Sequence, residues 1–234
     1  MKNKVVLLSG ANRGIGFAIA KKLYDAGYLI SLGVRNPSEM DSFIGDHDNS
    51  RILSQPIDLL DKVAMDNWIN STIEKFESID IVINCAGILK KTSIENYDET
   101  VIDEIFAINV KAPIYLVSKA WNYLKKSKEG RVINVCSLSA KRVKGGSYAY
   151  GMSKSALLSF THSIRHAGWN EGIRATAICP GWVNTKMIRE ICPFNLDEIT
   201  QPEDVAQLIL DVIQLPNRVS VPELAFNCQL EDLF

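Results

Sequence analysis

The sequence has no uninterrupted apolar run approaching the roughly 18 residues that a membrane-spanning helix needs. The apolar stretch at residues 5–8 is followed almost at once by glycine, so we do not expect a secretory signal core there. Neither sign of charge dominates, because 26 Lys and Arg residues oppose 27 Asp and Glu residues and leave a formal net charge of −1. We therefore expect no partnership with nucleic acid or membranes, and any anionic ligand must be held by a local site.

Signatures of metal binding and dithiol chemistry are also missing. The five cysteines are odd in number and widely spaced, without a C-x-x-C pair. Only three histidines occur, and although His162 and His166 are four residues apart, no third ligand is suggested. Cysteines inside apolar runs are typical of small buried hydrophobic residues. We expect no metal, and we expect a reducing, cytoplasmic environment.

The chain contains no Gly/Ser/Pro-rich linker, no internal repeat and no low-complexity segment. Its 234 residues are 47% apolar, 23% charged and 8% aromatic, which is ordinary for a globular protein and excludes collagen, coiled coil and disorder. Because α/β folds often reach 200 to 250 residues as one unit, we expect residues 1–234 to form a single domain.

Short β-branched or apolar runs alternate with longer helical patterns along the whole chain. The runs predict strands at residues 4–9, 28–34, 51–55, 80–84, 131–136, 173–179 and 224–228. The helical patterns predict helices at residues 14–26, 62–76, 98–126 with a break near Pro113, 148–169 and 202–214. This alternation predicts a doubly wound, Rossmann-type α/β/α sandwich of three layers, with a mostly or fully parallel sheet of about seven strands. Ligands of such folds bind beyond the carboxyl ends of the strands.

A glycine-rich turn, S-G-A-N-R-G-I-G at residues 9–16, follows the first predicted strand and enters a helix. Gly10 permits a tight turn, Gly14 lets the backbone approach a pyrophosphate, and Gly16 lets the helix pack closely on the strand. The helix N-terminus supplies unpaired N–H groups and partial positive charge. Taken alone, the turn is also compatible with a sharp loop that binds nothing.

The G-x-x-x-G-x-G spacing of this turn resembles the short-chain dehydrogenase/reductase family, in its small, single-domain, NADP(H)-preferring branch. N-C-A-G at residues 84–87 resembles the family's N-N-A-G element, with cysteine in the second position. Y-G-M-S-K at residues 150–154 gives Y-x-x-x-K, and Ser137 precedes its tyrosine by 13 residues. P-G-W-V-N-T at residues 180–185 resembles the segment beside the nicotinamide, and Asn109 lies at the position of the family's helix-embedded Asn.

The resemblance implies a nicotinamide cofactor, and two arginines favour NADP(H) over NAD(H). Arg35 directly follows the second predicted strand, where no acid is present, and Arg13 lies in the glycine turn. Arginine can meet a 2′-phosphate with a bidentate contact, although either residue alone reads equally well as a solvated cation. The resemblance implies cofactor binding by Gly10, Asn12, Arg13, Gly14, Ile15, Gly16, Arg35, Asp58, Leu59, Asn84, Ala86, Gly87, Tyr150, Lys154, Pro180, Gly181, Val183 and Thr185.

Tyr150 and Lys154 stand four residues apart on a predicted helix, which places both on one face. An ammonium one turn from a phenol favours the ionised phenol, so Tyr150 is the candidate acid/base. By resemblance, Ser137 donates a hydrogen bond to the substrate oxygen, Lys154 holds the nicotinamide ribose, and Asn109 orders a water through its backbone.

A short lid over the substrate is expected at residues 184–200. Ser139, Trp182, Met187 and Ile188 are candidate substrate residues, although the lid's apolar side chains also read as anchors to the core. Cations cluster near the site and allow an anionic substrate group or a solvated charged face: Lys90, Lys91, Lys141, Arg142 and Lys144. The resemblance further implies a homodimer or homotetramer formed through the helices at residues 98–126 and 148–169.

The function expected is an NADP(H)-dependent oxidoreductase that transfers hydride between the nicotinamide and a carbonyl or secondary alcohol of a small molecule. Two alternatives stay open at this point. One is a non-catalytic NADP(H)-sensing protein, which has no need of a tuned phenol. The other is an epimerase or dehydratase with a tightly held cofactor, for which the region after Gly181 leaves little room.

Overall fold

Seven strands form one sheet in which every neighbouring pair is parallel, in the order β3-β2-β1-β4-β5-β6-β7. The computed structural model describes residues 3–142 and 146–231. The strands are β1 (Val5–Ser9), β2 (Leu29–Val34), β3 (Ile52–Pro56), β4 (Ile81–Asn84), β5 (Arg131–Val135), β6 (Arg174–Pro180) and β7 (Glu223–Phe226). Every residue of β1, β4 and β5 is buried, which explains why these strands are mostly apolar. The predicted Rossmann-type fold is confirmed.

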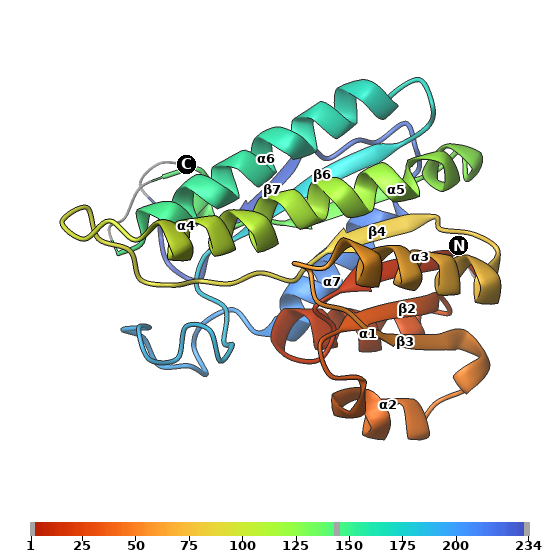
Figure 1. Cartoon of the computed structure of the whole chain (residues 1–234), viewed down its shortest axis with the longest axis horizontal. Coiled ribbons are helices and arrows are strands. Elements are labelled where there is room, and N and C mark those ends of the chain that lie inside the picture. The colour runs from red at the N-terminus through yellow and green to blue at the C-terminus, as the bar shows by residue number, and fades with distance from the viewer. Residues whose placement is uncertain (1–2, 143–145, 232–234) are drawn as a thin grey trace.

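Helices cover both faces of the sheet (Figure 1). On one face α1 (Gly14–Asp25) packs against α7 (Pro202–Gln214). On the other lie α3 (Lys62–Phe76), α4 (Glu99–Phe106), α5 (Ala112–Lys126) and α6 (Tyr148–Gly168). Each face therefore has its own apolar core, and the sheet separates the two.

Two regions of the chain show detail beyond the predicted elements. The break expected near Pro113 is a π-helical turn, Ala107–Lys111, directly before α5. Pro113 is the second residue of α5, which continues directly from that turn. The region after β2 also contains short elements that no sequence pattern predicts: the 3-10 turn Pro37–Met40, the helix α2 (Asp41–Gly45) and the 3-10 turn Asn49–Arg51.

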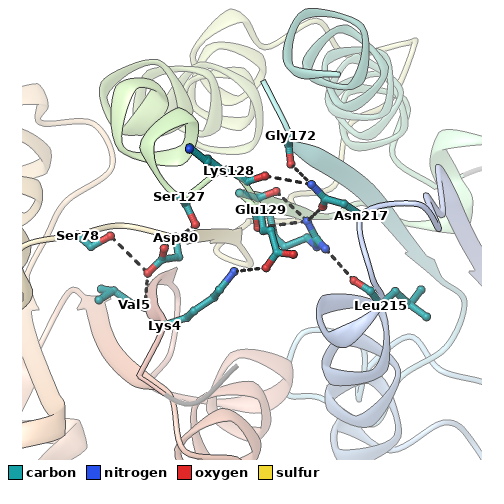
Figure 2. Close-up of polar contacts among 12 residues, drawn as sticks. Lys4, Val5, Ser78, Asp80, Ser127, Lys128, Glu129, Gly172, Leu215 and Asn217 are labelled. Carbon is teal, nitrogen blue, oxygen red and sulfur yellow. Dashed lines mark hydrogen bonds and ion pairs between the residues drawn. The ribbon is translucent and has the colours of Figure 1, made fainter. Parts of the chain in front are cut away.

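Polar contacts join the loops at the amino ends of the strands (Figure 2). The buried Arg131 guanidinium donates to the carbonyl of Leu215 at 2.7 Å and to the side chain of Asn217 at 2.5 Å. Asp80 accepts the backbone N–H of Val5 at 2.9 Å. These contacts hold together the loops at the amino ends of the strands. The residues of the candidate site lie at the carboxyl ends.

Candidate active site

The glycine turn joins the carboxyl end of β1 to α1. Gly10 has a φ of +76°, and a Cβ at this position would lie 2.8 Å from the Cα of Ala86, which follows β4. Only glycine fits this close approach. The N-terminus of α1 has neither a side-chain cap nor an acidic residue in its first turn, so its N–H groups are available to an anion.

The two arginines that could bind a 2′-phosphate are exposed, and an acidic residue, Glu39, is bonded to Asn12 in the glycine turn. Arg13 and Arg35 both present their side chains to solvent. The side-chain amide of Asn12 donates to the carboxylate of Glu39, in the 3-10 turn after β2. No local pattern points to Glu39, because it lies four residues beyond Arg35, whereas an acid that binds the ribose is expected at the end of the second strand.

The remaining residues predicted near the adenosine have local partners. Asp58 accepts the backbone N–H of Leu60 at 2.9 Å, which is a turn contact. Leu59 packs against the core formed with α3 and α5. Asp58 is exposed, and its carboxylate can accept about four hydrogen bonds, so the contact with Leu60 leaves it able to accept further ones.

Asn84 and its neighbours form the end of β4. The Asn84 side-chain amide donates to Asn134 on β5 at 2.8 Å, and Asn134 donates to Thr161 on α6 at 2.8 Å. This chain of buried hydrogen bonds ties the sheet to α6. The backbone N–H of Ala86 bonds to the Ser9 hydroxyl at 3.3 Å, which joins the end of β4 to the start of the glycine turn.

Asn109 stands in the π-helical turn between α4 and α5. Its side chain accepts the N–H of Ile88 at 2.9 Å and donates to the carbonyl of Ile88 at 2.9 Å. It also donates to the hydroxyl of Ser153 on α6 at 3.0 Å. The Asn109 side chain thus bridges the loop after β4 and α6, and π-helical turns of this kind occur often at functional sites.

The catalytic candidates lie between the carboxyl end of β5 and the first two turns of α6. The Lys154 side chain is buried, and its Nζ donates to the Val135 carbonyl at 2.8 Å. The same Nζ lies 5.7 Å from the ring centroid of Tyr150. Ser137 accepts the backbone N–H of Ser139 at 3.1 Å, and this leaves its own O–H free to donate.

These groups share a cavity of about 100 Å³. It is lined by Ile15, Cys85, Gly87, Val135, Cys136, Ser137, Tyr150, Lys154, Pro180, Gly181, Val183, Thr185, Met187 and Ile188. Most of this lining is apolar, so the polar groups of Ser137, Tyr150 and Lys154 stand out as the chemistry that the cavity offers. Burial raises the pKa of the Cys85 thiol to about 12, and the neighbouring Lys154 charge opposes this only in part.

The predicted lid is an irregular loop with its two ends side by side. Val183 pairs with Thr200, and the N–H of Asn184 donates to the Thr200 carbonyl at 2.9 Å. Met187 and Ile188 reach the cavity, whereas Trp182 and Ser139 are outside its lining. The Trp182 ring packs edge-on against Phe194, with 6.2 Å between the ring centroids.

The cations considered for an anionic substrate group are mostly paired with carboxylates of the chain itself. Lys90 pairs with Glu104, Lys141 with Glu223, and Arg142 with Glu231. Lys91 is exposed, and Lys144 lies outside the described residues. No cluster of three or more His, Cys, Asp or Glu suited to a metal occurs within residues 3–142 and 146–231. In the same ranges, no helix has the length and apolar character needed to cross a membrane.

Comparison with known proteins decides the family, because the profile described as "short chain dehydrogenase" matches residues 4–195. The chain belongs to the short-chain dehydrogenase family. That family comprises oxidoreductases that bind NAD or NADP. The motifs that suggested the resemblance all fall within the matched range.

Among curated relatives of this short-chain dehydrogenase, the agropine synthesis reductase of Rhizobium rhizogenes is 35% identical over 233 residues. That alignment covers 99% of this chain but 54% of the relative, so the chain spans about half the relative's length. An alcohol dehydrogenase from the archaeon Thermococcus sibiricus, complexed with 5-hydroxy-NADP, superposes with a TM-score of 0.89 at 22% identity over 99% of this chain and 100% of that one. The 3-ketoacyl-(acyl-carrier-protein) reductase of Brucella melitensis, complexed with NADH, gives 0.87 at 23% identity over 96% of each chain. The two structures establish the fold.

The residues present fit a nicotinamide dinucleotide. Glycine at position 10 lets the turn pack closely on Ala86, and the uncapped start of α1 that follows the turn offers N–H groups to a pyrophosphate. At the other end of the site, the apolar wall that includes Pro180 and Val183 suits the face of a nicotinamide ring, with the Lys154 ammonium beside it.

Proposed function

We propose that this short-chain dehydrogenase transfers hydride between NADP(H) and a carbonyl or secondary alcohol of a small molecule, with Tyr150 as the acid/base. The observation that carries the proposal is the meeting of Tyr150, Lys154 and Ser137 in one mostly apolar cavity. NADPH supplies the hydride when it is bound. The chain's own groups manage the proton and the charge on the substrate oxygen.

In the reducing direction, the Tyr150 hydroxyl donates a proton to the carbonyl oxygen, and the Ser137 hydroxyl donates a hydrogen bond to the same atom. The Lys154 ammonium, 5.7 Å from the phenol ring centroid, stabilises the phenolate that remains. Its hydrogen bond to Val135 holds it there. We assign to Asn109 the role of fixing the π-helical turn whose backbone orders a water for proton exchange with Lys154.

Replacement of the phenol hydroxyl tests this role. We expect Tyr150→Phe to lower kcat by at least about a hundredfold, the lower range of a lost general acid, while the Kd for NADPH stays within about twofold. Tyr148→Phe, at the start of the same helix, is the matched control. Carbonyl-dependent NADPH oxidation and fluorescence titration supply the two readouts.

The same assays separate the alternatives. NADPH binding without turnover of any carbonyl by the unaltered protein would indicate a sensor, and substrate conversion without net cofactor change would indicate an epimerase or dehydratase. A Tyr150→Phe variant of nearly normal activity would remove Tyr150 from the chemistry.

We further propose that NADP(H) is preferred, because Arg13 and Arg35 are exposed beside the glycine turn and can pair with a 2′-phosphate. We expect Arg35→Ala to weaken NADPH binding by about tenfold to a hundredfold, the loss of a charged hydrogen bond, and to leave NADH binding unchanged. Glu39→Gln removes the opposing acid beside Asn12 and is expected to strengthen NADPH binding. An unchanged NADPH/NADH ratio of Kd values in Arg35→Ala would refute the preference.

We propose that the working form is a homodimer or homotetramer in the cytoplasm. A groove of about 310 Å³ on the outer face of α5 and α6 is lined mainly by apolar side chains: Ile114, Val117, Ser118, Trp121, Phe160, Ser163, Ile164 and Ala167. A second copy of the same helix pair is a partner of matching chemistry. The five cysteines are all free thiols, which suits a reducing compartment.

A further inference from the structure

The C-terminal residues 227–231, which we term the tail strap, contact two segments that border the active-site cavity. The first segment follows β5 and contains Ser137, the 3-10 turn Leu138–Ala140 and Arg142. The second follows β6 and contains Gly181 and Trp182. Ser137 and Gly181 line the cavity from the two segments. Residues far apart in the sequence therefore meet beside the site.

The strap reaches the first segment through a buried ion pair. The Nε of Arg142 donates to Oε2 of Glu231 at 2.6 Å, and Nη2 of Arg142 donates to Oε1 at 2.7 Å. The two side chains are only 9% and 8% exposed. This bidentate contact fixes both distance and orientation, which a single contact of a lysine does not. The Glu231 carboxylate also raises the pKa of Arg142.

The strap reaches the second segment through Asn227. Its Nδ2 donates to Oε1 of Glu231 at 2.8 Å, and its Oδ1 accepts the backbone N–H of Trp182 at 3.1 Å. A Cβ on Gly181 would lie 2.0 Å from that Oδ1, so glycine is needed for the side chain to reach the backbone. The Gly181 N–H donates to the Phe226 carbonyl at 2.8 Å. The path from Arg142 to Trp182 is thus continuous.

A buried arginine near a dehydrogenase cavity invites a second interpretation, in which it receives a carboxylate of the substrate. The geometry argues against this, because Glu231 already occupies two of its donors in bidentate fashion. A buried ion pair adds little net stability to the fold. Separating the two partners is costly, however, because each would be left as a buried charge without compensation, so the pair holds one arrangement. The pair is therefore better suited to hold two loops in register than to bind a ligand.

We propose that Glu231 and Asn227 are positioning residues, which hold the Ser137 segment and the Gly181 segment at a fixed separation so that a carbonyl substrate lies correctly between them. This inference rests on the proposed function for its catalytic consequence. Its structural part, the restraint on the two segments, does not depend on which substrate the enzyme takes. In this arrangement the Arg142 guanidinium binds Glu231 of the tail strap, so it does not bind a carboxylate of the substrate.

The structural part is tested by hydrogen exchange with mass spectrometry on the full chain. In Asn227→Ala the Trp182 N–H loses its acceptor, and we expect peptides containing residues 181–182 to exchange at least about tenfold faster. Glu231→Gln is expected to accelerate exchange in peptides covering residues 138–142 as well. Glu129→Gln breaks the exposed Lys4–Glu129 pair at the opposite edge of the sheet and is the matched control, with no change at either segment.

The catalytic part is tested by steady-state kinetics with an active carbonyl substrate. We expect Glu231→Gln and Asn227→Ala to raise KM by about tenfold or more, with kcat changed less and the Kd for NADPH within twofold. If Glu231→Gln does not fold, the double variant R142Q/E231Q replaces it, because it removes the charges together. Unchanged exchange at residues 181–182 in Asn227→Ala would overturn the inference even in an inactive protein.

A gain of activity on carbonyl compounds that carry a carboxylate, seen in Glu231→Gln and lost again in R142Q/E231Q, would also overturn it. Arg142 would then be a substrate receptor that the tail blocks. If the unaltered protein reduced no carbonyl compound but the variants showed the expected hydrogen exchange, the proposed function would be rejected. The structural role of the tail strap would stand.

Discussion

At the scale of single residues, the structure shows how burial changes the chemistry of a side chain that the sequence only names. Cys85 stands where the resembled motif has asparagine, next to Lys154 and the cavity. Burial raises its pKa to about 12, so the thiol is neutral at physiological pH despite the nearby ammonium. A neutral thiol is a poor nucleophile, which leaves Cys85 as part of the apolar wall.

This neutrality has a measurable consequence. We expect iodoacetamide at pH 7.5 to leave Cys85 unmodified in the folded protein and to modify it after denaturation, as peptide mass spectrometry can show. Because the folded pKa of about 12 exceeds the reference of 9.0, the thiol's stabilising contribution is complete below pH 9 and is lost as the pH rises toward 12. The unfolding free energy of the unaltered protein should therefore fall more steeply over that range than that of Cys85→Ala. Rapid alkylation of the folded protein at pH 7.5 would contradict the assignment.

At the scale of elements, the irregular turn between α4 and α5 shows what periodicity leaves out. A helical pattern covers residues 98–126, and Pro113 is its only local sign of a break. The actual irregularity is the π-helical turn Ala107–Lys111, and within it Asn109 bonds to the backbone of Ile88, 21 residues earlier. A contact with a distant loop thus determines where the helix departs from regular geometry.

Removing that contact should loosen the same turn. We expect Asn109→Ala to lower the free energy of unfolding by about 2 to 3 kcal/mol, because the Ile88 N–H and carbonyl lose their partner in a mostly buried place. Asn122→Ala on the exposed side of α5 is the control and should change stability by less than about 0.5 kcal/mol. Urea denaturation followed by circular dichroism measures both, and equal stability of the two variants would show that the Asn109 contacts contribute nothing.

At the scale of the whole molecule, the apolar groove on α5 and α6 is the surface that we propose for self-association. Ile114, on its rim, is 40% exposed, so a charge there leaves the core intact. We expect Ile114→Glu to shift the protein toward monomer, since two facing carboxylates would have to be desolvated in the assembly. Val63→Glu, on the exposed side of α3 at 66% exposure, is the matched control. Light scattering coupled to size exclusion gives the mass, and an unchanged oligomer in Ile114→Glu would exclude this face.

The sequence by itself determined the order of strands and helices and the two-sided burial of the sheet, because periodicity and glycine spacing are local properties of the chain. It also placed Tyr150 and Lys154 together, since four residues on a helix make one turn. Only the tertiary structure decided that Asn12 meets Glu39, 27 residues away, and that Arg142 meets Glu231 across 89 residues. Those pairings depend on how whole elements pack, and no local pattern encodes which distant polar side chains become partners. For the same reason the cluster of cations near the site, which the sequence presents as a possible anion receptor, is largely neutralised by the chain's own carboxylates.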